Sequence, residues 1–333
     1  MTLDVSAGLG LWDETAGGSV TLINHSENHT FRVDGPTGLR TILRVHRPGY
    51  QSAATIESEL EWLAALRRDT DLPVPRAIPG KDGRLLQTVN VPGEPPRRAV
   101  LFAFEEGAEP AMGDDLGGVF ETLGRFAAIA HGHARLFRPS AGFTRQVWTA
   151  EAILDADGLW GDWRRAPGVG GAVQSTLTML DRRLRHDLAA YGRGPDRFGL
   201  IHADMRLANL LVDDGRVTLI DFDDCGFCWF MYDFAAAISF FEDSPEVPRL
   251  KRCWLDGYRA IAPLSPADEV ILDTMVLLRR MALLAWIGSH AETALARAHA
   301  DRFADGTVEL AERFLAGDQT RAVILSSPGL SRP

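Results

Sequence analysis

The stretch Leu200–Asp224, LIHADMRLANLLVDDGRVTLIDFDD, carries the strongest structural signal in the chain. Two short apolar runs, Leu207–Val212 and Val217–Ile220, flank the four residues Asp213–Arg216. Asp-Gly between two such runs is typical of a β-hairpin, because glycine adopts positive φ without strain and aspartate tolerates it. The sequence therefore predicts a hairpin here.

Polar side chains lie at both feet of this hairpin. Asp204 and Asn209 precede the first strand, and Asp221 ends the second. Because a hairpin brings its feet together, we expect these three oxygen-bearing side chains to converge. Such ligands suit Mg²⁺, which favours one or two carboxylates plus substrate phosphates over a closed protein cage. The alternative is an ordinary hairpin with polar turn and cap residues.

The spacing of these residues indicates phosphoryl transfer. His202-Ala203-Asp204 followed by Asn209 reproduces the H-x-D-x-x-x-x-N pattern of a kinase catalytic loop. Asp221-Phe222-Asp223 stands twelve residues beyond Asn209, where the metal-binding aspartate of the D-F-G motif belongs. The combination is much rarer than any one of its parts.

Size and composition exclude several classes of protein. A chain of 333 residues exceeds the usual single core, so we expect two lobes. The net charge of −10 argues against nucleic-acid and anionic-membrane partners. No apolar run approaches the about 18 residues that span a bilayer, and the N-terminal residues do not resemble a signal peptide. Three cysteines favour a reducing, cytoplasmic location. The oligomeric state is not predicted.

Cys225-Gly226-Phe227-Cys228 forms a C-x-x-C pattern. A redox pair or half of a zinc site would explain it. Cys253 is the only other cysteine, and no second C-x-x-C completes a metal site. A coincidence of sequence is the favoured interpretation.

The region from Ser19 to Arg47 predicts an antiparallel meander, with strands at SVTLIN, His29–Val33 and LRTILRVH. The turn after the first strand stands where kinases cover the nucleotide phosphates with a glycine-rich loop. Here that turn reads Asn-His-Ser-Glu-Asn and has no glycine. Its small polar side chains, Ser26 and Asn28, are the candidates for phosphate contact.

Arg44 on the third strand stands where a kinase has its phosphate-pairing lysine. The following segment, Ser52–Asp69, has the apolar spacing of a helix. We expect Glu59 on this helix to hold the cation in place, because Leu63 and Leu66 follow it as buried positions. Arginine is a planar fork and lysine a point charge, so the change is not neutral.

Further strands are expected at residues 84–91 and 98–104. Phe104 and Glu105 would then form the hinge that meets adenine, with a lobe boundary near Gly107. We predict an α+β fold with a small antiparallel-sheet N-terminal lobe (1–107) containing one main helix. A larger, mostly helical lobe (108–325) and a disordered tail (326–333) follow. The helices expected in the larger lobe are 114–136, 172–191, 232–241, 247–261, 266–290 and one ending near 316.

With these residues considered, the chain resembles the aminoglycoside phosphotransferase/choline kinase superfamily. HADMRLANLLVDDGRVTLIDFDD and YDFAAAISFFED match its H-x-D-x-x-x-x-N, I-D-[FW]-D-D and D-L-A blocks. SENHTFRV, ILRVHRPG, ESELEWLAAL and LPVPRAI are similar to its N-terminal elements, and the whole resemblance covers about Leu22–Glu242. Bacterial stress response kinase A and type II homoserine kinase are the most similar branches. The resemblance implies a bilobal, protein-kinase-like fold.

The resemblance also implies roles for individual residues. Asp204 would be the base or orienter of an acceptor hydroxyl, and Asn209 and Asp221 would hold Mg²⁺ against the phosphates of ATP. Three acidic residues would lie near the acceptor and pair with its ammonium group, namely Asp223, Asp224 and Glu242. Satisfying the local backbone is the alternative role of the two aspartates. Arg44 and the glycine-free turn depart from the family pattern, which bears on nucleotide affinity more than on the chemistry.

The function expected from the sequence is an ATP- and Mg²⁺-dependent kinase. Its acceptor would be a hydroxyl of a small amine-bearing metabolite, such as an amino alcohol, a hydroxy amino acid or an amino sugar. A protein Ser/Thr kinase of the stress response type and a nucleotide-binding pseudokinase remain alternatives. The sequence does not distinguish ATP from GTP.

Overall fold

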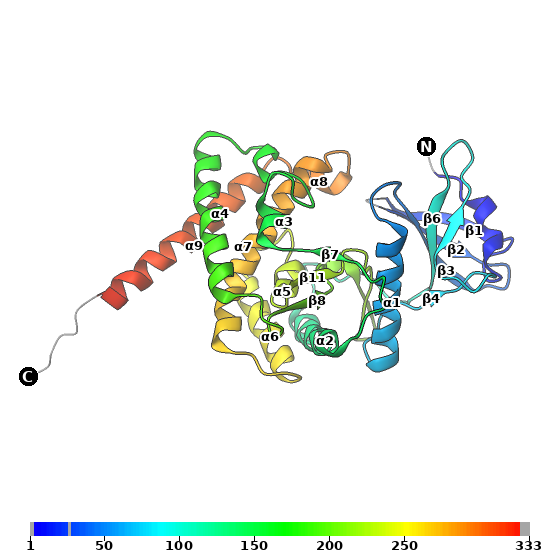
Figure 1. The fold of residues 1–333 in the computed structure, drawn as a ribbon, viewed down its shortest axis with the longest axis horizontal. Helices are drawn as coiled ribbons and strands as arrows, with labels where there is room; N and C mark the ends of the chain where they lie inside the picture. The colour runs from blue at the N-terminus through cyan, green and yellow to red at the C-terminus, as the bar shows by residue number, and fades with distance from the viewer. Residues whose placement is uncertain (1–2, 26–27, 327–333) are drawn as a thin grey trace, which may run out of the picture. The chain divides into compact units, whose positions relative to one another are not determined.

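The structure is a computed structural model that describes residues 3–25 and 28–326 of a mixed α+β chain (Figure 1). An antiparallel sheet has the strand order β1-β2-β3-β6-β4, and β5 also pairs with β6. Its strands are β1 (Ser19–His25), β2 (Asn28–Asp34), β3 (Arg40–His46), β4 (Ala77–Ile78), β5 (Gln87–Val89) and β6 (Arg97–Ala103). The predicted meander is confirmed. The strand expected over residues 84–91 is shorter, and β4 was not expected.

The two faces of this sheet have different surroundings, because successive side chains of a strand point to opposite sides. One face packs into an apolar cluster, whose sheet members include Phe31, Val33, Leu43, Val45 and Leu101. Trp12, which follows the 3₁₀ helix η1 (Ser6–Leu11), belongs to the same cluster. Arg44 and Phe102 are the direct sequence neighbours of Leu43 and Leu101 on their strands, so their side chains point to the opposite face of the sheet.

Helix α1 (Ala53–Asp69) confirms the helix predicted after the third strand. The Ser52 side chain accepts a hydrogen bond from the backbone N–H of Thr55 at 3.1 Å, which caps the N-terminus. The buried apolar positions of α1 recur every three or four residues, at Ile56, Leu60, Leu63 and Leu66. This spacing gives the helix one apolar face.

Strands β9 (Leu210–Asp213) and β10 (Arg216–Leu219) form the predicted hairpin, in which Asp213 pairs with Arg216. The two turn residues have positive φ, 44° at Asp214 and 78° at Gly215. Positive φ at both positions is the type I′ geometry that Asp-Gly favours, because its twist matches that of the strands. The local sequence thus determines the register of the two strands.

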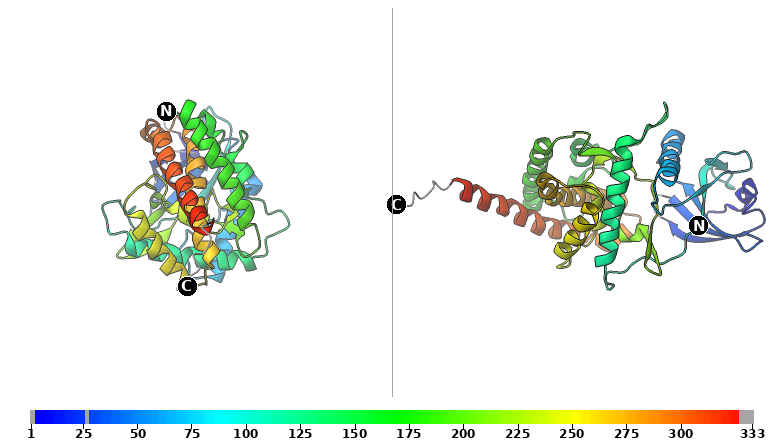
Figure 2. Two further views of the ribbon diagram at one scale, coloured as in Figure 1. Left: turned by 90° about the vertical axis from the view of Figure 1, so that its left-hand side faces the viewer. Right: turned by 90° about the horizontal axis from the view of Figure 1, so that it is seen from below.

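The remaining elements are mostly helical. Four of the longer helices match the predicted segments: α2 (Gly117–Leu136), α4 (Gly171–Tyr191), α6 (Val247–Arg259) and α7 (Pro266–Ser289). Helix α9 (Phe303–Ser326) continues past the end that was predicted near residue 316. Helices α4, α7 and α9 lie side by side (Figure 2). Shorter elements are α3 (Ala150–Leu154), η2 (Trp163–Arg165), η3 (Leu207–Asn209), α5 (Tyr232–Ala237) and α8 (Ala294–His299). A three-stranded sheet has the order β7-β11-β8, from Gln146–Val147, Gly226–Trp229 and Phe198–Ile201.

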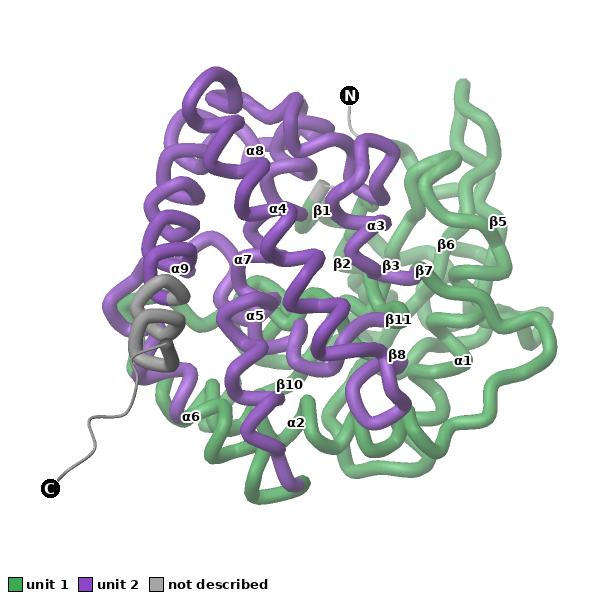
Figure 3. The backbone as a smooth tube through the Cα atoms, turned by 60° about the vertical axis from the view of Figure 1, so that its left-hand side comes forward, with its two compact units in different colours: residues 1–146, 200–227, 253–262 green, residues 147–199, 228–252, 263–333 purple. Residues whose placement is uncertain are grey.

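The chain divides into two compact units (Figure 3). Unit 1 comprises residues 1–146, 200–227 and 253–262, and unit 2 comprises 147–199, 228–252 and 263–333. This division differs from the predicted lobe boundary at Gly107, which stays a prediction. The predicted tail lies outside the described residues except for Ser326, the last residue of α9. Among the described residues, no helix combines the length and apolar character needed to cross a membrane.

Candidate active site

The loop from His202 to Asn209 begins where β8 ends and is held by its own side chains. The Nε2 atom of His202 lies 3.1 Å from the Ile220 carbonyl oxygen, and its Nδ1 accepts the Asp204 backbone N–H at 3.2 Å. His202 must therefore carry its proton on Nε2. Ala203 between them has φ +67°, so this turn is sharp. The histidine links the loop to the end of β10.

Asp204 and Asn209 lie in direct contact, as the hairpin predicted. The Asn209 Nδ2 atom donates to the Asp204 carbonyl oxygen at 2.8 Å and to its Oδ2 at 2.7 Å. The Ile220 N–H donates to the Asn209 carbonyl oxygen at 2.9 Å, which brings Asp221 next to this pair. Because the amide nitrogen of Asn209 is committed to Asp204, its Oδ1 is the atom that can face a ligand.

Asp221 and Phe222 point in different directions from the end of β10. Asp221 has φ +62°, and its side chain is 42% exposed. Phe222 is buried, with its ring centroid 4.5 Å from that of His202 and 5.7 Å from that of Trp62 on α1. The aromatic side chain thus joins the loop from His202 to Asn209 to α1, while the Asp221 carboxylate stays accessible.

Arg44 is buried and bridges two carboxylates. Its Nη2 lies 2.6 Å from Glu59 Oε1 and its Nη1 lies 3.2 Å from Asp221 Oδ1. Burial alone would lower the pKa of Arg44, but Glu59 and Asp221 outweigh it and the pKa lies above its ordinary value. The pairing of Glu59 with residue 44 that the sequence predicts is therefore present. The planar fork of arginine sends a different nitrogen to each carboxylate, whereas lysine would offer one compact ammonium.

A pocket of about 320 Å³ lies on the sheet face that carries Arg44. Its apolar lining includes Ile42, Pro75, Phe102, Phe104, Leu211 and Ile220. Glu105, Arg44, Glu59 and Asp221 add the polar part of the lining. An apolar slot with a few polar groups at its edge is typical of a small-ligand site. Both predicted hinge residues line it.

Asn28 and Asp223 are joined by a hydrogen bond, in which Asn28 Nδ2 donates to Asp223 Oδ2 at 2.7 Å. Burial and the neighbouring carboxylates of Asp221 and Asp224 raise the pKa of Asp223 well above its ordinary value. A cation bound beside these carboxylates would lower that pKa again. Ser26, the other residue predicted for phosphate contact, lies outside the described residues.

Glu242 belongs to unit 2 and is fully buried. Its Oε2 lies 2.5 Å from Arg280 Nη1. Burial raises the pKa of Glu242 above its ordinary value, although Arg280 opposes the shift. The structure thus gives this carboxylate a cationic partner within unit 2, and its contact with an acceptor stays a prediction.

A model of the phosphotransferase enzyme family, APH, matches residues 19–264. The chain belongs to this family. The solved structure of a microcompartment-associated aminopropanol kinase is 44% identical, with a TM-score of 0.87, over 94% of this chain and 97% of that one. An amicoumacin kinase in complex with AMP-PNP and Ca²⁺ is 19% identical, with a TM-score of 0.72, over 91% of each chain, which shows the shared fold.

An uncharacterized protein of Synechocystis is 28% identical over 244 residues, which cover 70% of this chain and 63% of that protein. The match therefore spans less than two thirds of that relative's length. Within the phosphotransferase family the chain has the expected protein-kinase-like α+β fold, and it is an enzyme of the kinase type. The family resemblance inferred from the sequence motifs is confirmed.

The donor set of this phosphotransferase fits a hard divalent cation. The Asn209 amide oxygen and the Asp221 carboxylate could contribute oxygen ligands. Among the residues described, no group of three or more His, Cys, Asp or Glu side chains could hold a metal by itself. A site with few protein ligands suits Mg²⁺, which retains waters and binds substrate phosphates.

The two cysteines of the C-x-x-C pattern are both buried. Cys225, Cys228 and Cys253 are free thiols. Burial raises the pKa of Cys225 to about 12 and also raises that of Cys228. A redox-active cysteine reacts as the thiolate, which these buried environments disfavour.

The sequence patterns missed two groups beside the site. The Nε of Arg206 lies 3.1 Å from Asp204 Oδ2, and its position two residues after the aspartate is the only sequence signal for this contact. Arg145 and Gln51 contact the backbone around Asp223. No motif marks either of them.

Proposed function

We propose that this chain is an ATP- and Mg²⁺-dependent kinase that transfers the γ-phosphate to the hydroxyl of a small amine-bearing alcohol. One observation carries the reaction type: Asp204, bonded to Asn209, and Asp221, bonded to Arg44, meet at the feet of one hairpin. The similarity to an aminopropanol kinase supports the acceptor class, because an aminopropanol carries both an amine and a hydroxyl. The AMP-PNP and Ca²⁺ of the amicoumacin kinase structure support a nucleotide and a divalent cation.

Each residue then has a distinct task. Asp204 accepts a hydrogen bond from the acceptor hydroxyl and takes its proton, while Arg206 and Asn209 fix the orientation of the carboxylate. Asn209 and Asp221 would hold the metal, which neutralises phosphate charge when bound. Positioning and charge neutralisation supply most of the catalysis, because the transition state of phosphoryl transfer is loose.

The remaining residues would bind the two substrates. The apolar pocket beside Phe104 and Glu105 would receive the nucleotide base. Arg44, held by Glu59, would lie near the phosphates, with Ser26 and Asn28 covering them. For the acceptor ammonium we propose Asp223 and Asp224, since a bound cation favours the charged form of a buried carboxylate. Glu242 remains the third acidic candidate.

The test is phosphoryl transfer from ATP-Mg²⁺ to matched acceptors, followed by phosphorus NMR of the product. 1-Aminopropan-2-ol, ethanolamine and homoserine are compared with the neutral propane-1,2-diol. We expect transfer to the amines only. Asp204→Asn should lower the rate roughly 10²–10⁴-fold, as expected for loss of a general base, with unchanged AMP-PNP affinity.

Asp214→Asn is the matched control, because it changes an aspartate at the hairpin turn, where asparagine also tolerates positive φ. Its rate should equal that of the unaltered protein. AMP-PNP binding without transfer to any acceptor would indicate a pseudokinase instead. Transfer only to a serine peptide would indicate a protein kinase.

A further inference from the structure

Arg145 is a buried arginine in the irregular segment that follows α2, and only 5% of it is exposed. Its hydrogen bonds go to neutral oxygen atoms from two distant segments of unit 1. Nε donates to the Cys225 carbonyl oxygen at 2.6 Å, and Nη2 donates to the Asp223 carbonyl oxygen. Nη1 donates to the Thr55 carbonyl oxygen at 2.8 Å. One side chain therefore joins the loop after Asp221 to the first turn of α1.

The attachment point on α1 is the turn that carries Glu59. In an α-helix the carbonyl of residue i accepts the N–H of residue i+4, so Thr55 precedes Glu59 by one hydrogen-bonded turn. The neighbouring Thr144 N–H donates to Ser58 Oγ at 2.9 Å, on the same stretch of helix. Residues 144 and 145 thus hold α1 where Glu59 contacts Arg44.

Gln51 provides a second connection between the same two segments. Its Nε2 donates to the Asp223 carbonyl oxygen at 2.8 Å, and its Oε1 lies 3.4 Å from Arg145 Nη1. The Gln51 carbonyl oxygen accepts from Arg98 Nη1 at 2.9 Å on β6. The Asp223 carbonyl is therefore fixed by two side chains that also contact each other.

The loop needs such support because Asp221 has φ +62°. A non-glycine residue with positive φ persists only when its surroundings determine its conformation. Arg145 bonds to three separate backbone carbonyls through three different nitrogen atoms, which explains why the residue is an arginine. Its rigid planar fork has five N–H donors, whereas lysine offers one compact ammonium.

We propose that Arg145 is a positioning residue that locks the Asp221 loop to α1, so that Asp221 and Glu59 stay in place for the metal–nucleotide complex. This inference rests on the proposed role of Asp221 in metal binding. Arg145 would act through its hydrogen bonds to the backbone carbonyls of Thr55, Asp223 and Cys225. These hydrogen bonds within the protein would hold α1 in position before any ligand binds.

The experiment measures Mn²⁺ binding in the presence of AMP-PNP, by electron paramagnetic resonance, for the unaltered protein and for Arg145→Met. Loss of a group that orients a metal ligand weakens affinity roughly 10–100-fold, and we expect a loss in this range. The KM for ATP-Mg²⁺ should rise. Arg145→Lys should recover part of the affinity, because one carbonyl contact can form.

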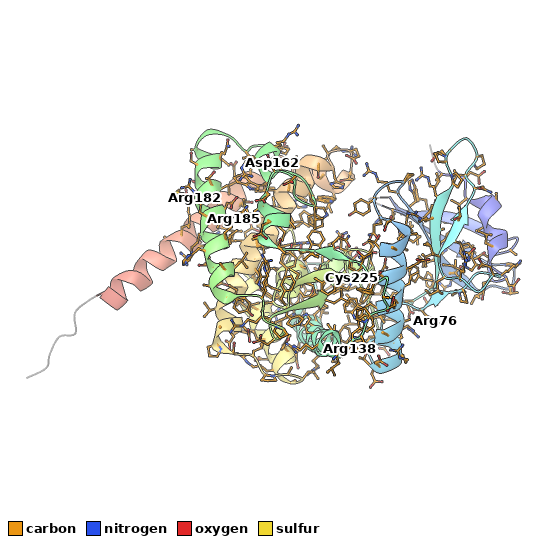
Figure 4. All side chains as sticks on the ribbon, in the orientation of Figure 1. Arg76, Arg138, Asp162, Arg182, Arg185 and Cys225 are labelled. Atoms are coloured by element: carbon orange, nitrogen blue, oxygen red, sulfur yellow. The ribbon has the colours of Figure 1, made fainter. Side chains whose placement is uncertain are left out.

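Hydrogen exchange without any ligand gives an independent measurement. Residues 222–226 and the first turn of α1 should exchange faster in Arg145→Met. Arg138→Met is the matched control: Arg138, labelled with Cys225 in Figure 4, is exposed and donates to the carbonyls of Leu136 and Phe137. It should behave like the unaltered protein in both measurements.

The outcomes separate this inference from the proposed function. If the unaltered protein binds no Mn²⁺–AMP-PNP, the proposed function fails. If it binds and Arg145→Met has the same affinity and the same exchange, Arg145 is not a positioning residue. Should Arg145→Met not fold, Gln51→Leu and Arg145→Lys serve instead, and unchanged affinity in both would equally overturn the inference.

Discussion

At the scale of single residues, the Arg44–Glu59 pair has a large influence on stability because both side chains are buried. Arg44→Met would leave the Glu59 carboxylate without its cation. Breaking a buried pair in this way costs about 3–5 kcal/mol, and we expect a loss of that size in urea unfolding. Arg44→Lys keeps the charge and should lose less.

Arg40→Met provides the comparison for Arg44. Arg40 pairs with Glu106, and both side chains are largely exposed. Exposed pairs contribute only about 0–1 kcal/mol, so this variant should unfold nearly like the unaltered protein. Equal losses for Arg40→Met and Arg44→Met would contradict the importance of burial.

His46 should make stability depend on pH. It is buried, and neither ring nitrogen has a hydrogen-bond partner among the described residues. Burial and the nearby cations Arg44, Arg98 and Arg145 lower its pKa well below the ordinary value. The folded protein therefore holds His46 neutral, while the unfolded chain binds a proton near pH 6.5.

The sign follows from this difference in proton binding. The contribution of His46 is complete above about pH 6.5 and is lost as the pH falls below it, by up to about 1.4 kcal/mol per pH unit. The free energy of unfolding of His46→Leu should therefore fall less between pH 7.5 and 5.5. Parallel curves for the two proteins would show that His46 is not held neutral.

A site residue can be predicted from the sequence when its contacts depend on residue types at a fixed spacing. Asp204, Asn209 and Asp221 belong to one continuous stretch, so spacing alone predicted that they meet. The contact of Glu59 with Arg44 followed from the apolar face of one helix. Arg145 could not be predicted, because its partners are backbone carbonyls of segments far away in the sequence, and every residue type has such a carbonyl.

At the scale of elements, local patterns predicted the long helices and the hairpin. The Asp214-Gly215 turn is the clearest case, since its φ values are those that the two residue types favour. The sequence patterns did not predict η1, β4 and α8, which are too short for a periodic signal. Their positions depend on packing against distant elements, as η1 shows by lying against β5.

Helices α2 and α6 approach each other so closely that only glycine fits between their backbones. A Cβ at Gly124 would lie 2.0 Å from the Trp254 carbonyl oxygen, and one at Gly257 would lie 1.9 Å from that of Glu121. Gly124→Ala must push the helices apart, which should cost about 1–3 kcal/mol. Thermal or urea unfolding measures the loss.

Gly132 on the same helix gives the opposite prediction. A Cβ there would meet nothing within 4 Å. Alanine within a helix is favoured over glycine by roughly 0.5–1 kcal/mol, so Gly132→Ala should stabilise the protein. If Gly132→Ala destabilised the protein as Gly124→Ala does, the expected gain from helix propensity would be wrong. The close crossing of the two helices would still be supported by Gly124→Ala.

At the scale of the whole molecule, the two compact units differ from the predicted lobes. The sequence places the hairpin at residues 210–219 far from the N-terminal sheet, whereas the structure groups both in unit 1. Connectivity along the chain predicts where one element ends and the next begins. It does not predict which distant segments share contacts, because those depend on tertiary packing.

All the described residues that we propose for nucleotide and metal binding belong to unit 1, so a defect confined to unit 2 should leave that binding intact. In unit 2, Arg280 pairs with buried Glu242 and also donates to Thr307 Oγ1 at 2.9 Å. Arg280→Met would leave the Glu242 carboxylate buried without a cation, at a cost of about 3–5 kcal/mol near neutral pH.

The pH dependence of Arg280→Met identifies the cause of this loss. Burial already raises the pKa of Glu242, and Arg280 lowers it, so the variant should raise it further. A carboxyl group whose pKa is higher in the folded than in the unfolded state stabilises the fold at pH values below its unfolded pKa. This stabilisation is lost as the pH rises through its folded pKa. The deficit in urea unfolding should therefore be larger at pH 8 than at pH 5. The double variant Arg280→Met/Glu242→Leu should recover part of the lost free energy of unfolding. The affinity for Mn²⁺–AMP-PNP should be the same in all these variants. A loss of stability that does not depend on pH would show that lost packing, rather than the unpaired carboxylate, destabilises unit 2.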